Sequence, residues 1–467
     1  MLLKQIYDED LAQASYFIGC QATGEAAVVD PRRDIQAYLN EAERRNMRIV
    51  AVTETHIHAD YLSGSRELAH ATGATLYLSD EGDQNWKYGF SGVKLYDGSE
   101  IRIGNIALQA VHTPGHTPEH LSFLVTDGAA TSEPGFILTG DFVFVGDIGR
   151  PDLLDEAAAG VDTRFGGAKQ LFASLKDKFL TLPDYVQVWP GHGAGSACGK
   201  ALGAVASTTV GYEKLVAWWA PYLHQDDESA FVDALLEGQP DAPAYFARMK
   251  RHNKQGPALL STLPRLKHYR AQELTGLLDK DYLLIDTRTR EDYMRGAVPG
   301  AIHIPAGRTF ATYASYVIDP EATTAPIVLL GATAEQAENL RNKLIGIGID
   351  RVDGFVSDLQ GAPTRSLATV SPEQLETLDN PFILDVRTKN EHRQGHIPGA
   401  VQIHAGRVVW QLDQLPSDRP IVTHCQSGAR SAVVASALRA AGYEDVRELE
   451  GSFDGWKQAH LTPAAGT

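Results

Sequence analysis

Thr55-His56-Ile57-His58-Ala59-Asp60 is the most informative segment of this chain. It directly follows residues 48–53, RIVAVT, whose β-branched side chains predict a buried strand. Imidazoles and carboxylates are common metal ligands, and a tight loop can turn several of them towards one point. The segment therefore predicts a metal-binding loop at the end of a strand.

Three further clusters of His or Asp have the same setting. They are His112-Thr-Pro-Gly-His116, Thr139-Gly-Asp141 and Pro190-Gly-His192, and each follows a short apolar run that predicts a strand. A single histidine in such a place is most often an ordinary core or surface residue. Four clusters at strand ends in one part of the chain make that interpretation poor, and together they favour a metal centre.

The first part of the chain, up to about Leu263, alternates short apolar runs with amphipathic stretches, which is typical of an α/β fold. The predicted strands are residues 16–19, 26–30, 48–53, 106–111, 121–125, 136–139 and 186–189. From Ser207 to about Lys254 the apolar spacing becomes helical and predicts a helical extension. Its predicted buried side chains are Leu215, Trp218, Trp219, Phe231, Leu235 and Phe246.

Length and charge limit the possible classes of protein. A chain of 467 residues is too long for one hydrophobic core and predicts roughly three domains. With 59 Asp and Glu against 42 Lys and Arg, the net charge of -17 argues against nucleic acid or an anionic membrane as a partner. The N-terminal segment MLLKQIYDEDLAQ lacks the apolar core of a signal peptide, so we expect a cytoplasmic protein. Three cysteines cannot form a disulfide framework, and Cys20 is interpreted as a core residue.

The rest of the chain contains an internal repeat. Residues 283–308, LLIDTRTREDYMRGAVPGAIHIPAGR, match residues 382–407, FILDVRTKNEHRQGHIPGAVQIHAGR, and residues 326–355 match residues 420–453. The repeat predicts two copies of one α/β domain, whose last helices end near Gly346 and Gly442 with a glycine cap. We therefore predict three domains, at residues 1–263, 264–366 and 367–467.

One cysteine lies at a strand-to-helix junction in the second copy. In residues 420–431, PIVTHCQSGARS, Cys425 follows an apolar run and precedes a helix predicted at residues 432–441. Backbone N–H groups and the helix N-terminus would stabilise its thiolate and lower its pKa. Arg430 can hold an anionic oxygen of thiosulfate or sulfite. In the first copy Gly331 takes the place of Cys425 and, if the loops align without a gap, Gln336 takes that of Arg430, so we expect that copy to be catalytically silent.

Taken in order, the segments THxHAD, TPGHT, TGD and PGHG resemble the metal-binding segments of the metallo-β-lactamase superfamily, over about residues 1–205. The resemblance implies an αββα sandwich with the metal site at one edge. In hydrolases of the superfamily, such as glyoxalase II, the first motif reads HxHxDH and its last His helps to hold a second zinc. Here Tyr61 stands in that place. A phenol, with its pKa of about 10, is a poor ligand, which favours a site for one metal.

Within the superfamily the chain resembles the persulfide dioxygenases. That resemblance implies one Fe(II) per chain, held by His56, His116 and Asp141, with open positions for a persulfide and O₂. His58, Asp60 and His192 would then orient ligands or water, although they could coordinate a different metal.

Two further loops, residues 145–152 and 191–200, resemble those of persulfide dioxygenases that are fused to rhodaneses. In the first loop Arg150 either binds a carboxylate of a glutathione-type substrate or forms a structural salt bridge. In the second, Cys198 either relays sulfur beside the metal or packs as a buried thiol.

Residues 370–460 resemble the rhodanese family, which implies a persulfide on Cys425 during sulfur transfer. The expected reactions are oxidation of a low-molecular-weight persulfide, such as glutathione persulfide, by O₂ to sulfite and thiol, and a sulfurtransferase step that forms or consumes thiosulfate. The alternatives are a zinc-dependent, glyoxalase-II-like hydrolase with a rhodanese tail, and a non-enzymatic sulfur carrier. The resemblance is also compatible with a homo-oligomer.

Overall fold

The computed structural model of the chain describes residues 1–153, 163–200, 202–239, 241–260 and 263–459. These residues form two compact units. The first comprises residues 1–239 and 246–261, and the second residues 240–245 and 262–467. Among the described residues, no helix is both long and apolar enough to span a membrane.

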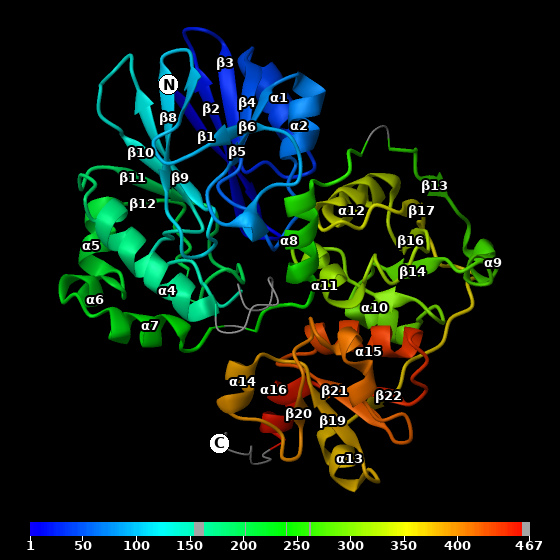
Figure 1. Cartoon of the computed structure of the whole chain (residues 1–467). Coiled ribbons are helices and arrows are strands. Elements are labelled where there is room, and N and C mark those ends of the chain that lie inside the picture. The colour runs from blue at the N-terminus through cyan, green and yellow to red at the C-terminus, as the bar shows by residue number, and fades with distance from the viewer. Residues whose placement is uncertain (154–162, 201, 240, 261–262, 460–467) are drawn as a thin grey trace. The chain divides into compact units, whose positions relative to one another are not determined.

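The first unit contains two mixed sheets (Figure 1). One sheet has the order β1-β2-β3-β4-β5-β6, and α1 and α2 pack on its outer face. Its strands are β1 (Leu2–Asp8), β2 (Gln13–Cys20), β3 (Glu25–Val29), β4 (Arg48–Thr53), β5 (Thr75–Ser79) and β6 (Val93–Leu95), and its helices are α1 (Gln36–Arg45) and α2 (Ser65–Thr72).

The other sheet has the order β12-β11-β10-β9-β8-β7, with further helices on its outer face (Figure 1). Its strands are β7 (Glu100–Ile103), β8 (Ile106–His112), β9 (Leu121–Asp127), β10 (Phe136–Gly140), β11 (Gln187–Pro190) and β12 (Thr208–Thr209). The helices of this part of the chain are α4 (Thr163–Ser174), α5 (Val210–Val216), α6 (Ala220–His224), α7 (Glu228–Leu236) and α8 (Tyr245–Gln255).

The main core lies between the two sheets. Tyr16 and Ile18 on β2 pack with Leu108 on β8 and Phe123 on β9, and all four side chains are buried. On the outer face of each sheet, a separate apolar layer packs the sheet against its helices. The unit is therefore an αββα sandwich, which confirms the fold class predicted from the sequence.

The strand ends bring the four sequence clusters together. Strand β4 ends at Thr53, β8 at His112, β10 at Gly140 and β11 at Pro190, each next to a predicted cluster. Gly140 has a φ of +48°, and a Cβ there would lie 2.5 Å from Thr55 Oγ1. Only glycine combines this left-handed backbone with so close an approach, so the turn after β10 can lie against the loop after β4.

The helical extension is largely as predicted, with one error. Trp219, Phe231, Leu235 and Phe246 are buried and Trp218 is partly buried, whereas Leu215 is 82% exposed. The short helix α5 turns Val210 and Glu213 into the core, so Leu215 falls on its outer face.

The second unit contains two parallel sheets of identical topology, which confirms the repeat. Their orders are β13-β17-β16-β14-β15 and β18-β22-β21-β19-β20. The first copy comprises β13 (Lys267–His268), α9 (Leu274–Leu278), β14 (Leu283–Asp286), α10 (Arg290–Arg295), β15 (Ile302–His303), α11 (Phe310–Val317), β16 (Ile327–Leu330), α12 (Ala334–Gly346) and β17 (Val352–Val356). The second comprises β18 (Thr369–Val370), α13 (Pro372–Thr377), β19 (Phe382–Asp385), α14 (Lys389–Arg393), β20 (Val401–Gln402), β21 (Ile421–His424), α15 (Ala429–Ala440), β22 (Val446–Leu449) and α16 (Ser452–Gln458).

Helix ends in the two copies differ from the prediction in detail. Helix α15 begins at Ala429, three residues earlier than predicted, and Gly442 with a φ of +95° follows it as predicted. In the first copy the predicted cap Gly346 is wrong, because it is the last helical residue and Gly348, with a φ of +75°, makes the left-handed turn. The domain boundaries after residues 263 and 366 stay predictions.

Candidate active sites

Three of the predicted metal ligands lie together at the edge of the sandwich. His56, His116 and Asp141 are buried, and their donor atoms all lie within 4.8 Å of one another. Asp141 Oδ2 is 3.5 Å from His116 Nε2 and 3.9 Å from His56 Nε2. Because they come from three separate loops, the fold brings them together.

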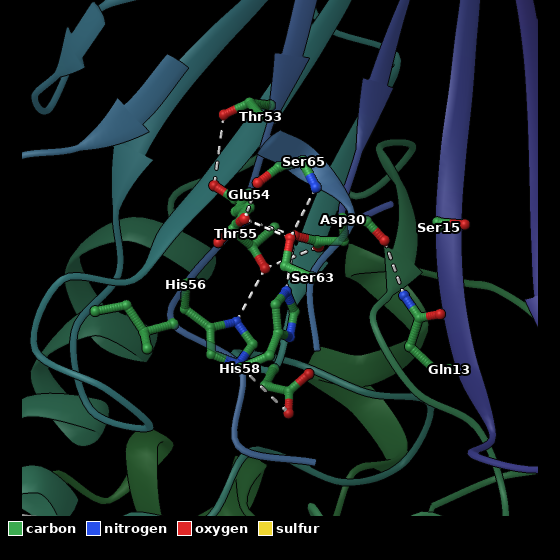
Figure 2. Close-up of polar contacts among 12 residues, drawn as sticks. Gln13, Ser15, Asp30, Thr53, Glu54, Thr55, His56, His58, Ser63 and Ser65 are labelled. Atoms are coloured by element: carbon green, nitrogen blue, oxygen red, sulfur yellow. Dashed lines mark hydrogen bonds and ion pairs between the residues drawn. The ribbon is translucent and has the colours of Figure 1, made fainter. Parts of the chain in front are cut away.

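Each imidazole is held so that its Nε2 atom is free. Thr55 Oγ1 donates to Asp30 Oδ2 at 2.9 Å and must therefore accept from His56 Nδ1, 3.0 Å away (Figure 2). His116 Nδ1 donates to the backbone oxygen of Arg150 at 2.9 Å. Fixing the proton on Nδ1 leaves the Nε2 lone pair of each ring available to a metal ion.

The donor set suits a bound cation. Neither carboxylate oxygen of Asp141 has a hydrogen-bond partner among the described residues, although both are buried. An unpartnered buried carboxylate is costly, and a metal ion removes that cost. Burial lowers the pKa of both His56 and His116, so their rings are neutral at pH 7. Neutral imidazoles beside a carboxylate are the protonation states that metal binding requires.

His58 is held to Asp30 through one ring nitrogen, while its Nδ1 is buried with no hydrogen-bond partner among the described residues. Its Nε2 lies 3.0 Å from Asp30 Oδ1 (Figure 2). Burial alone would lower the pKa of His58, but the Asp30 carboxylate raises it to about 9. A ring with both nitrogens protonated has no lone pair for a metal.

Tyr61 is equally engaged in structural contacts. Its ring lies against the ring of His58, with centroids 4.5 Å apart, and its hydroxyl donates to the backbone oxygen of Asp30 at 3.3 Å. Burial raises the pKa of Tyr61 well above its ordinary value, so the phenol is neutral. A neutral phenol held in this way is a poor metal ligand.

The other predicted supporting residues adjoin Asp141. His192 Nε2 lies 3.3 Å from Asp60 Oδ2 and 3.5 Å from Asp141 Oδ1, and its Nδ1 donates to the backbone oxygen of Ala12. Donor atoms of Asp60, His192 and Cys198 lie within 4.8 Å of one another. Burial and the charges of Asp60 and Asp141 raise the pKa of Cys198 well above its ordinary value, so its thiol is protonated. The roles of these residues stay predictions.

Arg150 has the contacts of a structural residue. Its side chain is 2% exposed, and Nε and Nη2 both donate to the carboxylate of Asp152. Nη1 donates to the backbone oxygen of Ala197 at 3.1 Å. A substrate carboxylate would have to displace Asp152, and the substrate-binding role of Arg150 stays a prediction.

Sequence reasoning missed two acidic residues that hold the metal loop. Asp30 accepts hydrogen bonds from Thr55, and Glu54 accepts from Ser65 and, at 2.5 Å, from Ser63 (Figure 2). Asp30 follows strand β3, as the other clusters follow their strands. The same strand-end argument would have found Asp30.

A third missed residue, Asn253, is distant in the sequence. From helix α8 its Nδ2 donates to the backbone oxygens of His58, at 2.8 Å, and Tyr61, at 2.7 Å. Its Oδ1 accepts from the backbone N–H of Ser63 at 2.9 Å. Asn253 is 1% exposed, so these bonds are shielded from water. No local pattern in the sequence signals this contact.

Cys425 lies at the predicted junction between β21 and α15, in a loop of residues 425–428 that we call the cradle. The backbone N–H of Gly428 points to Cys425 Sγ at 3.1 Å, and the hydroxyl of Ser431 lies 3.7 Å from it. Burial alone would raise the pKa of Cys425, but hydrogen bonds from Ser431 and Gly428 outweigh it and lower that pKa. The thiol is therefore set up to react as a thiolate.

Arg430 does not present a free guanidinium. Its Nη1 and Nη2 donate to Glu391 Oε2 and Oε1 at 2.8 and 2.6 Å. Burial alone would raise the pKa of Glu391, but the hydrogen bonds from Arg430 lower it to about 2. An anion binding at Arg430 would compete with this carboxylate.

The first copy lacks the cradle as well as the cysteine. A Cβ on Gly331, whose φ is +76°, would lie 2.4 Å from Arg288 Cγ. Thr333 and Gln336 cap the start of α12 with reciprocal hydrogen bonds, whereas Gly428 leaves the start of α15 without a side-chain cap. Backbone N–H groups at the start of α15 face the Cys425 thiolate, whereas those at the start of α12 already donate to the side chains of Thr333 and Gln336.

Comparisons with known proteins support the folds of both units. The family model of the metallo-beta-lactamase superfamily matches residues 8–192, and that of the rhodanese-like domain matches residues 270–359 and 371–459. A crystal structure of a metallo-beta-lactamase from Staphylococcus aureus is 40% identical, with a TM-score of 0.68, and covers 76% of this chain and 99% of that one. The chain belongs to the metallo-β-lactamase superfamily and carries two rhodanese-like domains.

Two kinds of curated relative match the first domain about equally well. The mitochondrial persulfide dioxygenase of Homo sapiens is 28% identical over 41% of this chain and 68% of its own length. A hydroxyacylglutathione hydrolase of Nitrosococcus oceani is also 28% identical, over 50% of this chain and 82% of its own length. A domain with persulfide dioxygenase homologues, followed by two rhodanese-like domains, matches a persulfide dioxygenase–rhodanese fusion.

Proposed function

We propose that the first domain is an iron-dependent persulfide dioxygenase and that the second rhodanese copy is a sulfurtransferase. The observation that carries the proposal is the arrangement of His56, His116 and Asp141 around one point, with His58 turned to Asp30. Two imidazoles and one carboxylate form the ligand set of non-haem Fe(II) oxygenases. When bound there, Fe(II) would supply open positions at which a persulfide sulfur and O₂ can meet.

In the proposed reaction a thiol persulfide, O₂ and water give a thiol and sulfite. The outer sulfur loses four electrons, O₂ accepts them, and water supplies the third oxygen of sulfite. The chain's own part is to hold the ligands: Thr55 and the Arg150 carbonyl fix the two rings, and Asn253 fixes the loop. His192 lies near the other carboxylate oxygen of Asp141, and Asp60 lies next to His192, so that the two could orient water or move a proton.

The sulfurtransferase step uses Cys425. Its thiolate attacks the outer sulfur of a persulfide, the S–S bond of the donor breaks, and the donor thiol leaves with the electron pair. Sulfite then attacks the outer sulfur held on Cys425, which releases thiosulfate and restores the thiolate. The hydrogen bonds from Gly428 and Ser431 would stabilise that thiolate before and after the transfer.

A zinc hydrolase is the second candidate, because Asp60, His192 and Cys198 could hold a second metal next to the first. Similarity to hydroxyacylglutathione hydrolases supports it. Against it stand the contact of His58 with Asp30 and the engaged phenol of Tyr61. A non-enzymatic sulfur carrier, with Cys425 active and the metal structural, is the remaining alternative.

Metal content together with O₂ uptake tests the proposal. We expect about one iron per chain and O₂ consumption when glutathione persulfide is added, both lost in His56→Ala. The matched control is His112→Ala in the same domain, because His112 donates to the Pro118 carbonyl outside the ligand group. Two zinc ions with thioester hydrolysis would favour the hydrolase, and iron without O₂ uptake would favour the carrier.

A further inference from the structure

Among the described residues, three guanidinium groups lie beside or in the loop that carries Cys425, and each is paired with a carboxylate. Arg387 donates to Gln426 Oε1 in the loop and is paired with Asp385. Arg290, from the first copy, approaches Gly428, where a Cβ would lie 3.4 Å from its Cζ, and is paired with the buried Glu448 at 2.9 Å. A dianion that binds at one of these guanidinium groups must compete with the carboxylate already paired to it.

The third pair, Arg430 with Glu391, is the one with the most exposed carboxylate. The side chain of Glu391 is 30% exposed, whereas those of Asp385 and Glu448 are fully buried. Both oxygens of Glu391 take hydrogen bonds from Arg430, and Oε2 also accepts from the backbone N–H and hydroxyl of Thr388. These bonds hold the carboxylate across the fork that would bind an oxyanion.

Resting on the proposed sulfurtransferase function, we propose that Glu391 is a specificity-determining residue that makes thiosulfate a weak sulfur donor to Cys425. The site then takes its sulfur from an organic persulfide in preference to thiosulfate. Glu391 competes with the oxyanion for the same two N–H groups and also repels it.

The two donor classes differ at the atom next to the transferred sulfur. In thiosulfate that atom carries three oxygens that share the negative charge, and these oxygens need the Arg430 fork. In an organic persulfide it is a sulfur attached to carbon, which needs no such fork. In both cases the Cys425 thiolate forms a new S–S bond while the donor's own bond to the outer sulfur breaks. The electron pair of the broken bond leaves on sulfite when thiosulfate is the donor, or on the donor's thiolate when it is an organic persulfide, so no oxidant is required.

The test is a comparison of the two donors on Glu391→Gln. Glutamine keeps the capping interaction with Thr388 but removes the charge, so the fold of α14 is preserved. Loading of Cys425 would be followed by intact-protein mass spectrometry at increasing thiosulfate or glutathione persulfide. We expect the half-saturating thiosulfate concentration to fall about tenfold relative to that of glutathione persulfide, which corresponds to about 1.4 kcal/mol.

Two further variants make the result specific. Glu444→Gln, an exposed position in the same domain, changes the net charge equally and should leave the ratio of the two donors as in the wild type. Adding Arg430→Gln to Glu391→Gln should abolish the improved loading by thiosulfate. If Glu391→Gln still loads sulfur but the ratio of the half-saturating concentrations of the two donors is unchanged, the role of Glu391 is overturned and the sulfurtransferase function is not. No loading of wild-type Cys425 by either donor would instead overturn the sulfurtransferase function.

Discussion

Replacing Asn253 by alanine removes the clamp that helix α8 places on the metal loop. The side chain makes three buried hydrogen bonds, to the backbone of His58, Tyr61 and Ser63. At about 1 kcal/mol net for each bond, the loop loses about 3 kcal/mol of stability. Alanine is itself a good helix former, so α8 is not the element that weakens.

Hydrogen–deuterium exchange of residues 55–65 measures this loss directly. A change of about 3 kcal/mol in the free energy of local opening corresponds to roughly a hundredfold faster exchange. We also expect faster loss of bound metal to a chelator, because His56 lies on the same loop.

The control is Asn40→Ala on helix α1, where an exposed asparagine makes one bond to Gln36. That variant should change the free energy of local opening by no more than a few tenths of a kcal/mol. If the folded Asn253→Ala protein kept wild-type exchange in residues 55–65, the positioning role of Asn253 would be refuted.

Four further outcomes follow from the second unit. Cys425→Ser should abolish sulfur transfer and leave O₂ uptake on added glutathione persulfide largely intact; equal loss of both would show that the sites are not separable. Ser431→Ala should move the pH midpoint of Cys425 alkylation upwards, since a donor to the thiolate is lost. Hydrogen bonds from Arg387 overcome the effect of burial and lower the pKa of Asp385 to about 2, against about 3.9 when unfolded. Ionised Asp385 should therefore add about 2 kcal/mol to the free energy of unfolding above pH 4, and this should be lost as the pH falls towards 2. In urea unfolding, Asp385→Asn should lack this dependence of stability on pH. Gly331→Cys in a Cys425→Ser background should not restore transfer, as measured by persulfide loading, and a loaded first copy would contradict our account.

The local motifs predicted the metal centre because each cluster follows a strand. Strands β8 and β10 both run antiparallel to β9, so they end at the same edge of the sheet, and His116 and Asp141 follow those ends. The same logic covered the cradle of Cys425, where strand and helix are sequence neighbours. A sequence pattern therefore predicts the position of a site residue where one strand and the turn that follows it determine that position.

Contacts between distant elements were not predictable in this way. Asn253 lies 190 residues beyond Ser63, and a polar residue on a helix gives no sign of its partner. Glu391 lies 39 residues before Arg430, and its spacing from Thr388 indicates only a helix cap. Leu215 was misplaced because a helix as short as α5 shows too few turns to define which face is buried.

Both sites use loops at strand ends, but they stabilise negative charge by different means. At the predicted metal centre both oxygens of Asp141 are buried without a hydrogen-bond partner among the described residues, so a bound cation would balance the charge. Metal binding and the stability of that edge are therefore coupled, because folding without the ion leaves the carboxylate uncompensated. At Cys425 backbone dipoles from Gly428 and Ser431 stabilise the thiolate, and the neighbouring cations are matched by carboxylates. The sulfur site can thus hold its own anion without a metal, and it attracts a second anion only weakly.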